Sequence, residues 1–154
     1  MSMDHSKAFT QAAIDVIGMV CGQTLTRGEA YTHHHTQIEN AVAVYLGITG
    51  QLQGYVLVRF SEENAKALAS AMMCGMPVEA IDDMAVSALS ELGNMIMGSA
   101  STNLAAEGIV TDITTPTLLK GTVQIMQASM TPLSIPLANE SMRVVLDVAL
   151  RESR

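Results

Sequence analysis

A long helical pattern near the middle of the chain is the feature that most restricts how this sequence can fold. Over residues 78–107 apolar side chains recur at the spacing of an amphipathic helix, and Gly108 supplies a stop signal. The apolar positions that share one side are Val86, Leu89, Leu92, Ile96, Ala100 and Leu104. A helix of this length needs a broad surface on which to bury its apolar side, and a β-sheet is the surface we expect.

The remaining segments contain enough β-rich runs to build such a sheet. Runs over 41–48 and 52–60 flank a Thr-Gly pair and predict an antiparallel hairpin. Further strands are predicted over 109–114, 122–128, 132–137 and 142–150. Pro132 and Pro136 fall within one of these runs, which favours an edge or bent position for that strand.

Two shorter helices complete the expected order of elements. The first covers 4–22, with Asp4 as N-cap and Gly22 as the stop, and the second begins at the N-cap Ser61 and ends before Gly75. We therefore predict one domain over 1–154 with an α+β fold, in which the long helix and the shorter helices pack on a largely antiparallel sheet. The order of a helix followed by strands occurs twice along the chain, which hints at a distant internal duplication.

Charge and composition exclude several classes of function. Fifteen acidic residues against eight basic ones give a net charge of −7, the wrong sign for a protein that binds nucleic acid or an anionic membrane surface. Apolar runs are too short to span a bilayer, and the first ten residues lack a signal-peptide pattern, so a cytoplasmic location is expected. Cys21 and Cys74 are widely separated, and we interpret both as buried, reduced thiols.

A polar stripe follows the side of the long helix opposite its apolar side. Its members are Ser87, Glu91, Asn94, Gly98 and Ser101, whose spacing keeps them in one line. The stripe contains no Lys or Arg, and it includes a glycine, which weakens a helix but lets another surface approach closely. By spacing alone, it is also compatible with an ordinary solvated helix face.

The spacing Ser87-x-x-x-Glu91-x-x-Asn94, followed after 21 intervening residues by Pro116, resembles a family signature. The family is that of the bacterial chemotaxis phosphatases CheC, CheX and FliY, in which the last spacer is about one residue longer. Segments 88–98 and 110–117 resemble CheX sequences in particular, and segments 47–50 and 71–76 agree with them. CheC-like members carry the signature on two helices and CheX-like members on one. Residues 4–23 contain neither Glu nor Asn, so the chain is similar to the CheX-like members.

This resemblance implies a CheC-like fold and hydrolysis of the aspartyl phosphate of CheY or a related receiver domain. It implies that Glu91 and Asn94 are the catalytic residues, with Asn94 positioning the attacking water and Glu91 pairing with a lysine of the receiver. The magnesium ion is expected on the receiver, and no cofactor or metal is expected on this chain. Ser87, Gly98 and Ser101 are the expected partner-binding residues.

The family resemblance also implies a homodimer. The run 142–150 is compatible with it, because its apolar edge would otherwise be left unpaired.

Two other functions remain open at this stage. One is a module that binds a receiver or a flagellar-switch protein without turnover, although the presence of both Glu91 and Asn94 favours the enzyme. The other is a metal-binding regulatory domain centred on His33, His34 and His35, for which no further ligand at a recognisable spacing is found. Asp82 and Asp83 are more simply explained by their favourable interaction with a helix N-terminus.

Overall fold

The computed structural model describes residues 5–32, 36–125 and 130–153. Its elements follow in the order α1 (Ser6–Cys21), β1 (Thr26–Arg27), β2 (Tyr31–Thr32), β3 (Thr36–Gly50), β4 (Leu52–Ser61), α2 (Glu62–Met72), α3 (Asp83–Ala106), β5 (Thr111–Ile113), β6 (Thr117–Ile125), β7 (Leu133–Ala138) and β8 (Arg143–Glu152). This order confirms the predicted helix, hairpin, helix, long helix and strands.

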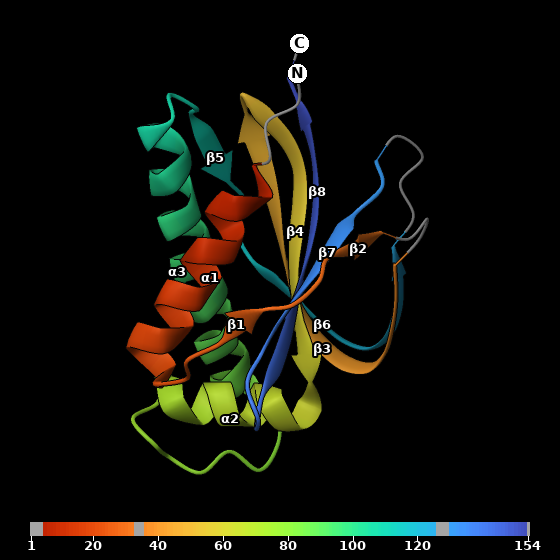
Figure 1. Cartoon of the computed structure of the whole chain (residues 1–154). Coiled ribbons are helices and arrows are strands. Elements are labelled where there is room, and N and C mark those ends of the chain that lie inside the picture. Colours follow the sequence, from red (N-terminus) through yellow and green to blue (C-terminus); the bar gives the residue numbers. More distant parts are fainter. Residues whose placement is uncertain (1–4, 33–35, 126–129, 154) are drawn as a thin grey trace.

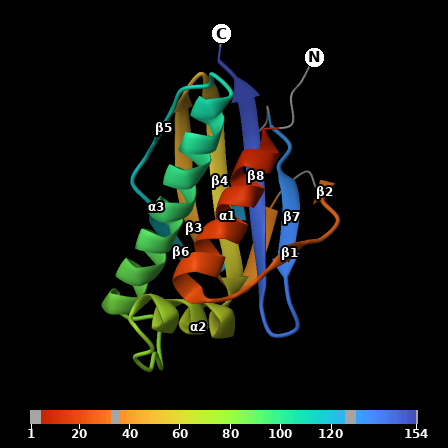
Figure 2. The ribbon, with the colours of Figure 1, turned by 60° about the vertical axis from the view of Figure 1, so that its left-hand side comes forward.

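The described strands form one antiparallel sheet, as predicted. Its order is β1-β7-β8-β4-β3-β5, with β2 also paired to β7 and β6 also paired to β3. Helices α1 and α3 lie side by side on one face of the sheet, and α2 crosses its end (Figures 1 and 2). The predicted α+β fold is therefore confirmed.

The β3–β4 hairpin is confirmed, and a glycine in β4 allows the close approach of β4 to β8. Register runs from Ala41 opposite Ser61 to Ile48 opposite Gly54. A Cβ atom at Gly54 would lie 1.8 Å from the carbonyl oxygen of Ala149 in β8, and its φ of +148° is unfavourable for other residues. Only glycine therefore fits where β4 meets β8.

The bounds of the long helix differ from the prediction. Helix α3 begins at Asp83 because Asp82 is its N-cap: the Asp82 carboxylate accepts a 2.9 Å hydrogen bond from the backbone N–H of Ala85. The segment 78–82 continued the apolar pattern but is not helical, since the capping aspartate ends the helix on that side. The predicted interaction of the aspartate pair with the helix N-terminus is confirmed.

The caps of the shorter helices agree in part with the sequence. Ser61 caps α2 by accepting a hydrogen bond from the backbone N–H of Asn64 at 3.1 Å, and Gly22 ends α1 in the left-handed conformation, both as predicted. The N-cap of α1 is His5, whereas the predicted cap, Asp4, lies outside the described residues.

Three strand predictions need correction. Strand β6 already begins at Thr117, since its first residues pair with β3, and the predicted extension over 126–128 lies outside the described residues. Strand β7 is not a free edge, because the two short strands β1 and β2 cover its outer side. Pro136 lies where these two strands are interrupted, and its carbonyl accepts a 2.7 Å bond from Gly28 N–H.

The third correction concerns the last strand. β8 pairs with β4 on one side and β7 on the other, so it is an interior strand. The prediction that 142–150 would leave an unpaired apolar edge is therefore wrong, and this strand gives no support to a dimer.

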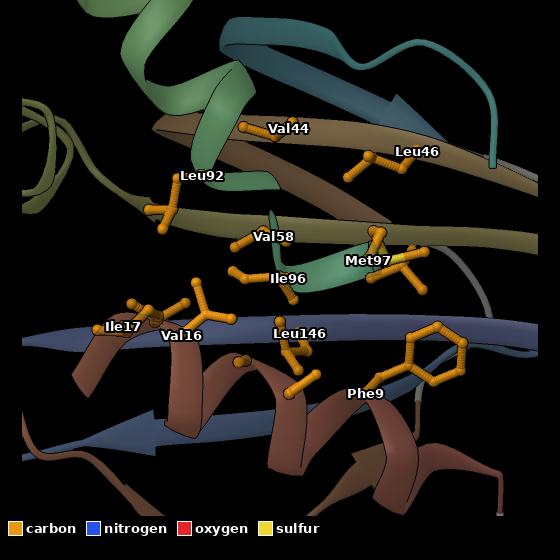
Figure 3. Close-up of a cluster of buried hydrophobic side chains, with 14 of the residues drawn as sticks. Phe9, Val16, Ile17, Val44, Leu46, Val58, Leu92, Ile96, Met97 and Leu146 are labelled. Carbon is orange, nitrogen blue, oxygen red and sulfur yellow. The ribbon is translucent and has the colours of Figure 1, made fainter. Parts of the chain in front are cut away.

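The main core lies between the helices and the sheet. In Figure 3, Phe9 and Ile17 of α1 and Leu92, Ile96 and Met97 of α3 all point toward the sheet residues that the figure labels. The strand side chains that meet them are Val44, Leu46, Val58 and Leu146, all 1% exposed or less. Burial of this one continuous layer fixes which side of α3 is left outward.

A buried ion pair stabilises the opposite face of the sheet. The fully buried Asp147 carboxylate accepts hydrogen bonds from Arg59 Nε at 2.6 Å and from Ser134 Oγ at 2.5 Å. Burial alone would lower the pKa of Arg59, but its hydrogen bond to Asp147 and the charge of that carboxylate outweigh burial and raise it. Removing either partner would leave a charge without compensation in the sheet.

The cysteines are free thiols, but only Cys21 fits the expected environment. It is half-buried, and burial raises the pKa of its thiol, whereas Cys74 is exposed after α2 in the left-handed conformation. The prediction of a buried Cys74 is therefore wrong. Within the described ranges, no helix is long and apolar enough to cross a membrane.

Candidate catalytic face of the long helix

The buried side of α3 agrees with the predicted apolar side, with a small rotation. Its buried residues are Ala85, Ala88, Leu89, Leu92, Gly93, Ile96, Met97, Ala100 and Leu104. Val86, which was assigned to this side, is only half-buried, whereas Ala85, Ala88, Gly93 and Met97 are buried but were not assigned to it. The buried side of α3 is therefore rotated slightly about the helix axis relative to the predicted apolar side.

Gly93 explains how closely α3 approaches the sheet. A Cβ atom at this position would lie 2.9 Å from Val44 Cγ1 and 3.4 Å from Leu46 Cδ1 of β3. The helix backbone therefore rests almost directly on these two side chains, one residue before Asn94. Sequence reasoning missed this role, and a glycine next to a polar motif on a helix was the only available signal.

On the outward side, the structure brings together four of the five predicted stripe residues. Ser87, Glu91, Asn94 and Gly98 are all exposed, which confirms the predicted helix face. A Cβ atom at Gly98 would meet no atom within 4 Å, so the space above this glycine is open. The face beside Asn94 is therefore accessible to another molecule.

Ser101, the fifth residue, lies at the end of the stripe in a different environment. It is half-buried, and its hydroxyl forms a 3.1 Å hydrogen bond with the hydroxyl of Thr111 in β5. This bond joins the C-terminal half of α3 to the edge of the sheet. Its predicted role in partner binding stays a prediction.

The two polar side chains at the centre of the stripe are unengaged. Throughout the part of the chain that the structure describes, no hydrogen bond or ion pair involves the Glu91 carboxylate or the Asn94 amide. They are three residues apart on one helix, so they project side by side about one turn from each other. A carboxylate and an amide held in this way can receive a cation and a hydrogen-bonded water from outside.

The segment carrying Pro116 is anchored to the sheet. The hydroxyl of Thr114 accepts a 2.8 Å bond from Gly47 N–H, and the backbone N–H of Thr114 donates to the Gly47 carbonyl at 3.0 Å. A Cβ atom at Gly47 would lie 3.0 Å from Thr114, so glycine allows this close pairing. Pro116 follows, half-buried, between β5 and β6. The family resemblance includes both segments, but the sequence does not predict that they touch.

The alternative metal site is not tested by the structure. His33, His34 and His35 lie outside the described residues. Within the described ranges, no group of three His, Cys, Asp or Glu side chains is arranged to hold a metal ion.

Comparison with known proteins identifies close relatives of this fold. Residues 42–138 match the family model described as chemotaxis phosphatase CheX. Over 114 residues, which are 74% of each chain, the sequence is 36% identical to the CheY-P phosphatase CheX of Thermotoga maritima.

Solved structures are similar over almost the whole chain. A CheC-like superfamily protein from Shewanella sp. PV-4 matches with a TM-score of 0.86 and 21% identity, covering 98% of this chain and 99% of that one. CheX in the CheX–CheY–BeF3–Mg²⁺ complex from Borrelia burgdorferi matches with a TM-score of 0.81 and 24% identity, covering 98% and 100%. These likenesses show that the fold is CheC-like.

Proposed function

The chain belongs to the chemotaxis phosphatase CheX family, and from this premise we propose that residues 1–154 act as one phosphatase domain on phosphorylated CheY or a related receiver domain. The observation that carries the proposal is the pair of unengaged side chains, Glu91 and Asn94, at the centre of an exposed helix face. The relative from T. maritima is named a CheY-P phosphatase, which supports the same substrate class.

In this proposal, Asn94 positions the water that attacks the phosphorus atom. An amide is neither a base nor a nucleophile at neutral pH, but its carbonyl oxygen can accept from a water while its NH2 group donates to the water or to a phosphoryl oxygen. Phosphoryl transfer needs little covalent help from the protein, so placement of the water accounts for much of the rate. The magnesium ion would be held by the receiver, where it would neutralise phosphoryl charge.

Glu91 has a different role, because its carboxylate would repel the phosphoryl oxygens. We assign it to a charge-assisted hydrogen bond with a lysine of the receiver. Since Glu91 precedes Asn94 by about one helical turn, this bond fixes both the position and the rotation of the receiver on α3. Ser87 and Gly98 then lie at either end of the contact, and the absence of a side chain at Gly98 lets the phosphorylation site come close to Asn94.

The decisive experiment is the decay of acyl phosphate on candidate receivers. Each receiver of the same organism is phosphorylated with a small-molecule donor, and the decay is followed with no addition, with the wild-type chain and with Asn94→Ala. Faster decay with the wild-type chain alone supports the proposal. Binding of a receiver without any faster decay would instead favour a non-catalytic receiver-binding module, and unchanged decay on every receiver would contradict the phosphatase.

We also propose that the chain forms a homodimer, an inference that rests on its family and not on β8. Light scattering at micromolar concentration is expected to give twice the mass of the 16.3 kDa chain. A mass equal to that of one chain would contradict this proposal and would leave the phosphatase proposal unaffected.

A further inference from the structure

An open groove of about 580 Å³ lies beside Glu91, between the end of α2 and the first half of α3. The residues that define this methionine groove are Met72, Met73 and Met84 together with Asp83, Ser87 and Glu91. Two of them, Ser87 and Glu91, also belong to the polar stripe. The groove is therefore continuous with the proposed catalytic face and extends it toward the N-terminus of α3.

The apolar part of the groove is unusually exposed for this protein. Met84, in the first turn of α3, is 58% exposed. Met72 and Met73 are half-buried, since they also pack against the main core. Methionine side chains are flexible and polarisable, so a surface built from them can adapt its shape to an apolar side chain from a partner.

The charge of this region is strongly one-sided. Residues 67–119 contain no Lys, Arg or His, while they contain the acidic residues Glu79, Asp82, Asp83, Glu91, Glu107 and Asp112. Asp83 and Glu91 are the ionisable residues that line the groove, and both are acidic. A partner that fills the groove gains most when it presents a Lys or Arg next to its apolar group.

The position of the groove relative to Asn94 indicates which partner covers it. At 1.5 Å per residue, Asp83 lies about 16 Å along the helix axis from Asn94. A receiver domain of ordinary size is about 30 Å across, so one centred on Asn94 reaches about 15 Å along α3 and covers the groove as far as Met84, ten residues away. The groove then contacts the receiver beside its phosphorylation site and not at the reacting atoms.

We propose that the methionine groove binds an apolar side chain of the phosphorylated receiver, flanked by a Lys or Arg of the same receiver. This inference rests on the proposed function, because it deepens the description of the same contact. The groove adds affinity equally before and during hydrolysis, so it contributes to KM and not to kcat.

The test compares two matched methionine substitutions. Met84→Gln keeps the length of the side chain and replaces its thioether with an amide, and Met19→Gln makes the same change on α1 at a methionine that is 77% exposed outside the groove. We expect Met84→Gln to raise KM about tenfold with kcat nearly unchanged, and Met19→Gln to change neither. Both side chains are exposed, so circular dichroism and thermal unfolding should match the wild type.

A charge variant tests the second half of the proposal. Asp83→Asn removes one carboxylate from the groove, while Asp112→Asn removes one from β5, away from the groove. We expect Asp83→Asn to raise KM a few-fold at low salt and to reduce the salt dependence of kcat/KM. Asp112→Asn should leave the salt dependence closer to that of the wild type.

A direct binding measurement separates this inference from the proposed function. The Asn94→Ala chain is titrated with beryllofluoride-activated receiver, whose decay cannot interfere, and the titration is repeated with Met84→Gln or Met19→Gln added to that chain. Weaker binding with Met84→Gln supports the groove even if no receiver is dephosphorylated faster by the wild type. Equal Kd and KM values for Met84→Gln and Met19→Gln, no binding of any receiver, or a change in oligomeric mass caused by Met84→Gln would each overturn the groove proposal.

Discussion

Helices α1 and α3 meet the same sheet with nearly the same burial pattern, but only α3 carries the Glu–Asn pair that we propose to be catalytic. The buried apolar residues Ala8, Phe9, Ala12, Ala13, Val16 and Ile17 of α1 correspond in order to Ala88, Leu89, Leu92, Gly93, Ile96 and Met97 of α3, eighty positions later in the chain. The two helices also lie side by side on the sheet (Figure 2). This correspondence agrees with the internal duplication that the order of elements suggested.

The outward positions of the two helices differ in chemistry. In the same register, Gln11 and Ile14 of α1 occupy the places of Glu91 and Asn94, and Gly18 corresponds to Gly98. Ile14 is half-buried against the main core, whereas Asn94 is exposed. The Gln11 amide donates a 2.7 Å hydrogen bond to the Asp15 carboxylate, so it is engaged within its own helix. Packing against the sheet constrains the inward residues of both helices, but it leaves the outward residues free to differ. Substitutions at corresponding outward positions therefore provide matched controls.

The largest difference between the helices should appear with Asn94→Ala. We expect kcat for receiver dephosphorylation to fall on the order of 10²-fold or more, because the water loses the group that positions it. Receiver binding and thermal stability should be nearly unchanged, since the side chain is exposed and its removal leaves no cavity. Gln11→Ala on α1 is the control and should keep full activity. Turnover close to wild type by the Asn94 variant would contradict the assigned role.

Gly98→Leu and Gly18→Leu form the second pair. A leucine at Gly98 should reduce activity by up to about 10²-fold by holding the phosphorylation site away from Asn94. Gly18→Leu should leave activity unchanged. A Cβ atom at Gly98 would meet no atom within 4 Å, and one at Gly18 would lie 3.8 Å from the carbonyl oxygen of Gln23, so neither change should unfold the protein. If Gly18→Leu were as damaging as Gly98→Leu, the receiver would have to contact α1 as well.

The third pair tests Glu91. We expect Glu91→Ala to lower kcat/KM about tenfold, the worth of one charge-assisted hydrogen bond, and Glu91→Lys to lower it further by opposing a lysine of the receiver. Gln11→Lys introduces the same charge at the corresponding position of α1 and should have a smaller effect. The measurement is the dependence of the rate on receiver concentration, compared between the Glu91 variants and Gln11→Lys. An unchanged dependence for both Glu91 variants would show that this carboxylate is merely solvated.

The sequence predicted most of the fold because its signals are local. The long helix, the hairpin around Gly50 and the cap at Ser61 each depend on a few neighbouring residues, and the structure confirms them. Errors arose where distant segments decide the outcome. β8 is an interior strand because β7 returns beside it, and β7 is covered because β1 and β2 come from the other end of the chain. No local pattern contains these pairings.

The candidate site shows the same contrast between local signals, which the sequence reveals, and contacts between distant segments, which it does not. Helical spacing alone placed Ser87, Glu91, Asn94 and Gly98 on one exposed face, as the structure confirms. It could not reveal that Ser101 bonds Thr111, that Thr114 pairs with Gly47 or that Met84 lines a groove with the end of α2. Each of these contacts joins residues from different elements, whereas helical spacing describes only the residues of one helix.

The smallest expected effect concerns the inward position where the two helices differ. Ala13 of α1 is fully buried with its methyl group accommodated, whereas a methyl at the corresponding Gly93 would lie 2.9 Å from Val44 Cγ1. Gly93→Ala gains up to about 1 kcal/mol of helix propensity, but the contact with a stiff β-branched side chain costs about 1–3 kcal/mol.

We therefore expect Gly93→Ala to lower the free energy of unfolding by about 1 kcal/mol and Tm by about 2–4 °C, with a few-fold loss of kcat because the displaced helix carries Asn94. Gly98→Ala is the control in the same helix. No atom lies within 4 Å of its new Cβ, so the gain in helix propensity is unopposed and Tm should rise by about 2–4 °C. Calorimetry of the two variants gives shifts of opposite sign if α3 rests on Val44 as described. A rise in Tm for both would mean that the sheet has room for a methyl group at Gly93, and that the close approach of α3 to β3 is not what positions Asn94.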